Sequence, residues 1–342
     1  MPSILAAILV LLSLLLPACS SSVDAQSERV IARAVEGLGG EAALKGVSTI
    51  TVGGTTTITA GSFHQSRPFV HHAKRPSKSY YETPLGSRKL IFATNGTMAW
   101  TQNDGALAPY AMPENEARAV VDQARFEPFY FDLEKHGITV SYLGEHDVAS
   151  LDPDMDRERL EGLRYLHPDG DSIEVYFDLE TGRLRMTSRN IQTSIGPTET
   201  QKWFGDYRRV GPIFVAHESF SLFPGEKHVT VVETVVVNEP IDDDVFELAP
   251  PPTLGEGHLD ALAGVYTIEP DETVRIRRAG NALIYQSTDG PALEMTAVAD
   301  TLFLVGSGRD MYNVIFARPA DGASETLTLQ KGEQRRMGRR NP

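Results

Sequence analysis

Three histidines close together in the sequence are the first candidates for metal chemistry. His64, His71 and His72 lie in one short segment, and the neutral imidazole ring is a common metal ligand. Adjacent side chains of a strand point to opposite faces, so His71 and His72 cannot hold the same ion without a bulge. We therefore expect these histidines on a solvated strand edge, with no metal.

Two acidic runs are the next candidates for binding a cation. The run from Asp152 to Asp156 starts like a calcium-binding loop, with an aspartate at every second position. Its sixth position is Arg157, where the sharp turn needs glycine, and its twelfth is Leu163, where the bidentate glutamate belongs. The three residues 242–244 are all aspartates, a residue type that favours turns and helix N-termini. Neither run predicts a metal site.

The best catalytic combination consists of His217, Glu218 and Asp206. If the segment is a strand, His217 and Glu218 face opposite sides of the sheet and cannot work together. The sequence contains no G-x-S-x-G elbow, P-loop or dinucleotide-binding G-x-G-x-x-G, and no S-x-x-K with the companions of a lactamase. We therefore expect a protein that is not an enzyme and that needs no cofactor.

Cys19, the only cysteine of the chain, directly follows an apolar run. Residues 4–16 are apolar except for Ser13, which suits a signal-peptide core and is too short to span a bilayer. The order Leu16, Pro17, Ala18, Cys19 resembles the lipobox of bacterial lipoproteins, in which the leader is removed and the cysteine is acylated. The resemblance implies a signal peptide over 1–18 and a lipid on Cys19. The alternative is an ordinary secretory signal that is cut nearby.

Composition limits the remaining possibilities. The formal net charge of -14 argues against non-specific binding of nucleic acid, which needs a basic surface. The chain is 41% hydrophobic and 23% charged, as in an ordinary globular protein. A single cysteine allows no intramolecular disulfide, so the fold depends on its hydrophobic cores.

Hydrophobic periodicity predicts two domains. A polar tether over 19–26 precedes an amphipathic helix that begins near Ser27 and ends at Gly39–Gly40, and a short helix follows over 41–45. A further helix is expected over 114–122, where Pro113 introduces good helix formers. β-Branched residues with period two predict the strands of this domain, 27–249, at 48–52, 55–59, 78–82, 88–93, 98–100, 138–143, 164–167, 172–178, 184–191, 212–223 and 227–238.

A proline-rich linker, 250–258, separates a smaller unit. Residues 259–336 contain five or six short strands, at 264–268, 273–278, 282–286, 302–305, 313–317 and 326–330, whose spacing favours a small barrel or a folded meander. The last dozen residues are strongly basic, and we expect a disordered tail over 337–342.

Aromatic residues are the candidates for a ligand-binding surface. Their rings bury large apolar areas, at about 25 cal/mol per Å², and so suit a hydrophobic core and an apolar cavity equally well. The cluster between Phe126 and Phe131 includes Pro128 and lies in a connecting segment, which favours a mobile cover over an open sheet. The candidates for the wall and cover of such a cavity are Trp100, Phe126, Phe129, Tyr130, Phe131 and Trp203.

Several short segments, taken in order, resemble the periplasmic carriers related to the outer-membrane lipoprotein-sorting proteins, the LolA/LolB-like family. They are Gly39–Gly40, Trp100, the helix near Glu116, Leu143–Gly144, Trp203–His217, Val235–Asn238 and Ile241–Phe246. The resemblance implies a protein that is mainly β with α, in which a curved antiparallel half-barrel sheet carries helices on its concave face. It also implies a role in shielding acyl chains. The carriers are usually soluble shuttles, whereas the acceptors of similar fold are lipoproteins.

The small domain resembles the β-rich module appended to serine-hydrolase and penicillin-binding-like proteins. The matching segments are Leu262–Tyr266, Gly280–Leu283, Asp300–Phe303 and Asn313–Phe316. In those proteins the module is an appendage, which implies a non-catalytic, barrel-like, all-β domain here.

Together these features predict a lipid-anchored protein of the bacterial cell envelope that binds a hydrophobic small molecule, a lipid or a lipoprotein. Ser20, the residue after the lipobox cysteine, resembles the signal for transport to the outer membrane, where the protein would face the periplasm. The alternative is a non-catalytic scaffold or sensor that binds a partner protein of the envelope.

Overall fold

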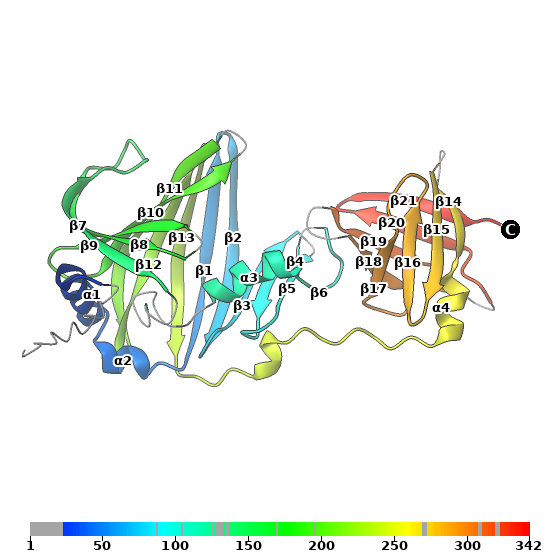
Figure 1. Cartoon of the computed structure of the whole chain (residues 1–342), viewed down its shortest axis with the longest axis horizontal. Helices are drawn as coiled ribbons and strands as arrows, with labels where there is room; N and C mark the ends of the chain where they lie inside the picture. The colour runs from blue at the N-terminus through cyan, green and yellow to red at the C-terminus, as the bar shows by residue number, and fades with distance from the viewer. Residues whose placement is uncertain are drawn as a thin grey trace, which may run out of the picture.

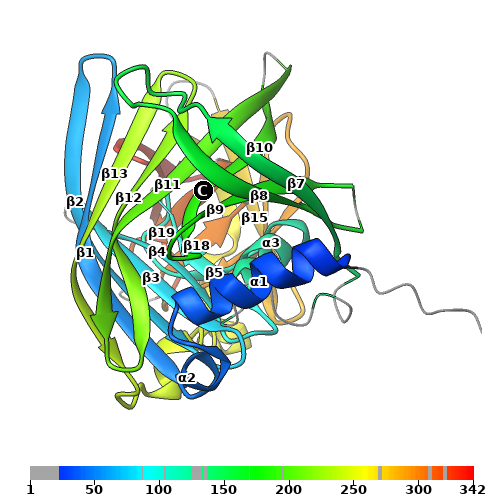
Figure 2. The ribbon, with the colours of Figure 1, turned by 90° about the vertical axis from the view of Figure 1, so that its left-hand side faces the viewer.

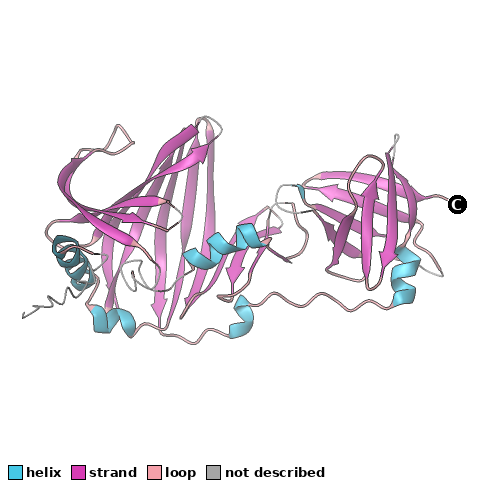
Figure 3. Cartoon of the chain, in the orientation of Figure 1, coloured by secondary structure: helices cyan, strands magenta, loops and turns pink. Residues whose placement is uncertain are grey.

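The computed structural model describes residues 23–342 except 87, 104, 125, 127–132, 134–136, 169, 194–195, 269–271, 307–309 and 319–321. Cys19 with its leader, and the aromatic residues Phe129, Tyr130 and Phe131, lie outside the described residues. The fold is mainly β, with a large curved antiparallel sheet followed by a closed barrel (Figure 1 and Figure 3). The predicted fold class is confirmed. None of the helices in the described part is long and apolar enough to cross a membrane.

The large sheet has 13 strands in the order β6-β5-β4-β3-β2-β1-β13-β12-β11-β10-β9-β8-β7, and neighbours are antiparallel. It curls into an open half-barrel (Figure 2). The first and last strands of the domain meet at its centre, where β1 pairs with β13. The strands are β1 Thr49–Ala60, β2 Phe63–Lys74, β3 Lys78–Leu85, β4 Arg88–Thr94, β5 Ala99–Gln102, β6 Tyr110–Ala111, β7 Thr139–Val148, β8 Glu158–Leu166, β9 Ser172–Asp178, β10 Leu184–Thr193, β11 Gly196–Val210, β12 Ile213–Phe223 and β13 Glu226–Val237.

Helix α1, Ala25–Gly37, begins earlier than the sequence predicts. The side chain of Asp24 accepts hydrogen bonds from the backbone N–H groups of Gln26 and Ser27, both at 2.9 Å, and so caps the helix. Ser27, the predicted N-cap, is instead buried inside the first turn. The last residues of the predicted tether, 25 and 26, therefore belong to the helix. Helices α2, Glu41–Lys45, and α3, Glu114–Gln123, lie where the sequence predicts them.

Helix α1 covers one face of the sheet because its apolar side chains fall on one side. Val30 and Ala34 pack with side chains of β8 and β9 in a single buried cluster, which includes Leu163 and Phe177. Burial of such side chains contributes about 25 cal/mol per Å² of apolar surface. This cluster holds α1 on the concave side of the half-barrel (Figure 2).

The C-terminal domain is a closed barrel of eight strands. A 3-10 turn η2, Asp243–Phe246, precedes the predicted linker 250–258. Helix α4, Glu256–Leu262, begins inside that range, so the last three residues of the predicted linker are helical. Side chains from β14 to β20 fill the interior of the barrel, among them Tyr266, Phe303 and Phe316. The strands are β14 Gly264–Ile268, β15 Glu272–Ala279, β16 Ala282–Ser287, β17 Leu293–Ala297, β18 Leu302–Val305, β19 Tyr312–Phe316, β20 Thr326–Lys331 and β21 Gln334–Arg340.

The predicted disordered tail is wrong, because its residues form most of β21. This strand pairs with β20 along its length and with β14 at its end, so it closes the barrel. Gly338 lies between Ile268 and Leu327 and is buried. The basic composition of the segment suggested disorder. In the barrel, however, alternate arginines point outward, and the backbone of the segment forms the hydrogen bonds of the sheet with β20 and β14.

A loop of the large domain docks directly onto the barrel. The loop between β5 and β6 places Ala106 in a buried cluster with Leu304 and Met311 of the barrel. Asn313, which is 0% exposed, accepts a hydrogen bond from the backbone N–H of Leu107 at 2.8 Å. Its amide nitrogen donates to the carbonyl oxygens of Gly105, at 2.6 Å, and of Gln330, at 3.2 Å. The linker is thus not the sole connection between the domains.

Replacing Asn313 by alanine should loosen this contact. Three hydrogen bonds are lost and buried backbone groups lose their partners, which should cost about 2 kcal/mol. We expect hydrogen exchange at the Leu107 amide to become at least about tenfold faster. Asn190→Ala, at an exposed asparagine of β10, is the matched control and should leave that rate unchanged. Equal exchange rates in both variants would contradict the docking role of Asn313.

Candidate functional site

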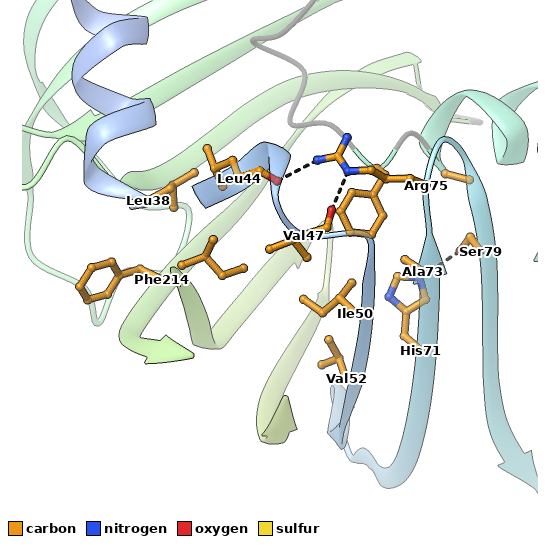
Figure 4. A pocket seen from close by; sticks show the side chains of 13 residues that line it. Leu38, Leu44, Val47, Ile50, Val52, His71, Ala73, Arg75, Ser79 and Phe214 are labelled. Atoms are coloured by element: carbon orange, nitrogen blue, oxygen red, sulfur yellow. Dashed lines mark hydrogen bonds between the residues drawn. The ribbon is translucent and has the colours of Figure 1, made fainter. Parts of the chain in front are cut away.

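An apolar cavity of about 370 Å³ lies between the concave face of the sheet and the segment that joins α1 to β1 (Figure 4). Its volume falls within the range of sites for small ligands. Strands β1, β2, β3 and β12 supply the floor, and the connections near α2 and after α3 supply the rest. The lining residues are Leu38, Leu44, Val47, Ile50, Val52, His71, Ala73, Arg75, Ser79, Ala124, Phe126, Ile213 and Phe214.

Strand alternation and register explain why the floor of the cavity is apolar. Ile50 and Val52 are two residues apart on β1 and therefore share a face. In the ladder with β2, Ile50 is opposite Ala73 and Val52 is opposite His71. Ala73 in turn is opposite Ser79 of β3. Small and branched side chains thus alternate across three strands and leave room above Ala73.

Arg75 ties the roof of the cavity to the turn between β2 and β3. Its Nε donates to the carbonyl oxygen of Val47 at 2.6 Å, and one Nη donates to that of Leu44 at 2.8 Å (Figure 4). The guanidinium carbon lies 4.7 Å from the centre of the Phe126 ring, a cation–π distance. One side chain therefore holds both the α2–β1 connection and the aromatic ring that follows α3.

His71 is the one titratable side chain besides Arg75 among the lining residues. Its Nε2 lies 2.9 Å from the hydroxyl oxygen of Ser79. Desolvation, followed by the nearby His72, lowers the pKa of His71 to about 4. The ring is therefore neutral at physiological pH, so it suits an apolar cavity and offers a polar contact to a ligand.

The prediction of a solvated strand edge is therefore wrong for His71. Strand β2 is not an edge strand, since it pairs with β1 and β3. His72 faces the opposite side, as alternation predicts, with its Nδ1 2.9 Å from the hydroxyl oxygen of Thr51. His64, near the start of β2, is exposed. In the described part of the chain, no three side chains are arranged to hold a metal ion.

Of the predicted aromatic wall, Phe126 lines the cavity. Trp100 is buried against Ile91 and Ala93, and its indole N–H donates to the carbonyl oxygen of Phe246 at 2.9 Å. This residue therefore belongs to the core beneath η2. Phe129, Tyr130 and Phe131 lie outside the described residues.

Trp203, also a predicted wall residue, lies on the other face of the sheet. It is opposite Phe220 in the ladder between β11 and β12, whereas the cavity residue Ile213 has the opposite parity on β12. Trp203 is 0% exposed, and its indole N–H donates to the side-chain oxygen of Gln201 at 3.1 Å. That oxygen also accepts from the backbone N–H of Leu151, so the β7–β8 connection covers this ring. Alternation alone does not reveal which face is concave.

The predicted acidic runs form ion pairs within the described structure. Asp152 pairs with Lys227, and Asp243 lies 2.8 Å from the amine of Lys74 and 3.0 Å from that of Lys78. These cations hold the pKa of both carboxyl groups below its usual value. The aspartates thus fasten connecting segments to neighbouring strands.

Of the weak catalytic candidates, Asp206 and His217 lie close enough for His217 to help Arg208 lower the pKa of the Asp206 carboxyl group, but each of the two side chains has another partner. Asp206 pairs with Arg208, and the Nδ1 atom of His217 lies 2.9 Å from the carbonyl oxygen of Val215. Glu218, as alternation predicts, has the opposite parity on β12. The residues that line the cavity, such as Ile50, Ala73 and Arg75, were not singled out by the sequence because nothing in their spacing distinguishes them from core residues.

These features define a two-domain protein in which a half-barrel with an apolar cavity precedes a closed barrel. No family model and no curated protein matches the sequence. Among solved structures, the chain is similar to a LolA superfamily protein from Nitrosomonas europaea, at 13% identity and a TM-score of 0.45, with 65% of this chain and 97% of the other covered. A DUF1329 family protein from Desulfovibrio piger matches at 10% identity and a TM-score of 0.47, covering 64% and 96%. The MucA/MucB complex from Pseudomonas aeruginosa matches at 13% identity and a TM-score of 0.24, covering 92% of each chain.

The matched solved structures include the superfamily to which the sequence motifs point. At sequence identities of 10–13%, the likeness concerns the fold alone. The resemblance of the C-terminal barrel to the hydrolase-appended module stays a prediction.

Proposed function

We propose that this chain is a non-enzymatic, lipid-anchored protein of the bacterial envelope that binds an acyl chain or another apolar ligand in the half-barrel cavity. Acylation of Cys19 would hold it at the outer membrane, facing the periplasm. The observation that carries the proposal is the cavity itself, about 370 Å³ with mostly aliphatic walls. Such a cavity binds by excluding water from apolar surface, so it requires no nucleophile, metal or cofactor.

The contacts around the cavity also suit reversible capture. The roof consists of the short helix α2 and its flanking residues, which Arg75 holds through two hydrogen bonds to carbonyl oxygens. Breaking these bonds would let the α2–β1 connection and Phe126 move apart. A neutral His71 with a hydroxyl partner would offer the ligand one polar contact, such as to an ester or carboxyl oxygen.

Filling the cavity should weaken the binding of a fluorescent fatty acid. Ala73 is 9% exposed and lies on the cavity floor, so Ala73→Phe would place a ring in the space that the ligand needs. For delipidated protein we expect saturable binding that Ala73→Phe weakens by at least about tenfold, or 1.4 kcal/mol. The assay is a fluorescence titration at constant protein concentration.

Val231→Phe is the matched control for this experiment. Val231 is 47% exposed on β13 and is not a lining residue, so its replacement should leave the affinity unchanged. Thermal unfolding of both variants checks the fold, because overpacking costs about 1–3 kcal/mol. Equal affinities of wild type and Ala73→Phe would place the ligand elsewhere. A wild type that binds no fatty acid, together with a stable partner protein, would favour the scaffold alternative.

The proposed anchor has its own test. Mass spectrometry of the protein purified from its native membrane should find a chain that starts at Cys19 and carries the mass of attached acyl groups. The same spectrum should contain any lipid that co-purifies in the cavity. A chain that starts elsewhere without added mass would support the ordinary secretory signal.

A further inference from the structure

A basic surface lies on the outer wall of the C-terminal barrel. We call it the basic strip and define it by Arg335, Met337 and Arg339 of β21 together with Arg275 and Arg277 of β15. All five side chains are exposed. Their neighbours Val274, Ile276 and Gly338 are buried in the barrel, and Arg336, between Arg335 and Met337, is exposed and pairs with Glu272 of β15. Because neighbouring side chains of a strand alternate, the five members of the strip share the outward face.

The two strands of the basic strip are joined into one surface by β14. Thr267 of β14 is opposite Arg339 on one side and Thr273 on the other, and Val265 is opposite Arg275. Strands are spaced about 4.8 Å apart, which places the Arg339 and Arg275 backbones on the order of 10 Å from each other. Val265 and Thr267 therefore lie between two rows of arginines. The strand order can be followed on the barrel in Figure 1.

The arginines of the strip carry charge that is not neutralised by the described residues. The ion pairs of the barrel use Arg278, Lys331 and Arg336. Within the described part of the chain, no carboxylate forms an ion pair with Arg275, Arg277, Arg335 or Arg339. Met337, in the middle of the β21 row, is 62% exposed. The strip thus combines four uncompensated cations with an exposed apolar side chain.

The charge of the strip contrasts with that of the large domain. Residues 1–258 contain 22 Lys and Arg but 35 Asp and Glu, whereas residues 259–342 contain 10 and 11. The barrel is nearly neutral overall, so its arginines form a local basic surface on an acidic protein. Such a surface attracts densely anionic partners.

We propose that the basic strip docks the barrel onto anionic lipid headgroups of a membrane. The barrel is closed, so it has no free strand edge to which a peptide could add, and the strip lies on its convex wall. A lipid surface needs neither a groove nor an edge. Arginines bind lipid phosphates bidentately, and Met337 enters the interface between them. This contact is separate from the Cys19 anchor and from the cavity.

Vesicle co-sedimentation tests the proposal. The protein is the mature chain 19–342 with Cys19→Ser, which cannot be acylated. We expect binding to vesicles that contain phosphatidylglycerol, none to pure phosphatidylcholine, and loss of binding in about 0.5 M salt, where charges are strongly screened. Arg335→Glu/Arg339→Glu should lower the affinity at least about tenfold, and Met337→Ser should lower it less.

The matched control is Arg189→Glu/Arg209→Glu, which makes the same change of charge at exposed arginines of the large domain. It should keep most of the affinity. Unchanged melting temperatures show that the variants fold. Binding of the strip variant at wild-type strength, equal binding to neutral vesicles, or binding of polyglutamate but not of phosphatidylglycerol vesicles would each overturn the proposal. The vesicle experiment uses no fatty acid. A negative result would therefore refute membrane docking by the basic strip without bearing on ligand binding in the cavity.

Discussion

Replacing Glu161 by glutamine should lower the free energy of unfolding of the large domain by about 3 kcal/mol. Glu161 is 2% exposed on β8, beneath α1. Its carboxylate accepts a hydrogen bond from Arg29 at 2.8 Å, one from the hydroxyl of Tyr142 at 2.9 Å, and a further bond from Arg33. The neutral amide would leave two guanidinium groups of α1 without a counter-charge. One of them, Arg33, is largely covered by protein, so solvent would compensate only in part.

Glu145→Gln is the matched control, because Glu145 lies in the same sheet as Glu161 and forms an ion pair with Arg159. There both Glu145 and Arg159 are exposed, and such surface pairs contribute about 0–1 kcal/mol. Thermal unfolding should show a drop of about 6–12 °C for Glu161→Gln and a small change for Glu145→Gln. Equal shifts would mean that α1 is held by its apolar contacts alone.

Acid should destabilise the large domain through His71. The pKa of His71 is about 4 in the folded protein, whereas an unfolded histidine titrates near 6.5. Between these values the unfolded chain binds the additional proton, so stability falls as the pH falls from about 6.5 to about 4. The stabilising contribution is fully present above pH 6.5 and is lost below pH 4. Its size is about 3 kcal/mol.

The contribution of His71 is measured by comparing the free energy of unfolding of variants, from urea unfolding between pH 7 and pH 4.5. His71→Gln removes the titrating group, so its stability should depend on pH less steeply than that of the wild type. His64→Gln, at an exposed histidine of the same strand, should keep the wild-type slope. The hypothesis of a neutral, desolvated His71 fails if the wild type and His71→Gln have parallel pH profiles.

Much of the fold could be predicted from local patterns. The period-two runs predict most of the half-barrel strands, and the helix over 41–45 agrees with α2 to the residue. Strands β2, β6 and β11 were not predicted, because polar residues, proline and glycine obscure the alternation of β2 and β11 and because β6 has only two residues. The two runs predicted on either side of Gly53–Gly54 are a single strand, β1. In the small domain five or six strands were predicted and the barrel has eight. Strand β21 was missed because five basic residues in the last twelve resemble a solvated tail.

An apolar cavity on the half-barrel sheet could be predicted from the sequence, but most of the residues that line it could not. Aromatic residues were expected to form the wall, and of those that the structure describes, Phe126 lines the cavity while Trp100 and Trp203 belong to cores. The wall is instead made by aliphatic residues of β1 and β2 and by His71. Such residues look the same in a sequence whether they face a packed core or a cavity.

The sequence by itself determined the alternation of each strand, the two-domain organisation and the lack of a recognisable catalytic motif, because these follow from local composition and spacing. Only the tertiary structure decided which face of each strand is concave, which side chains are desolvated and how the barrel docks. These properties depend on contacts between residues far apart in the chain, such as Asn313 with Leu107 and Glu161 with Arg33. Desolvation of His71, likewise, requires the residues of three strands and the roof to assemble around it.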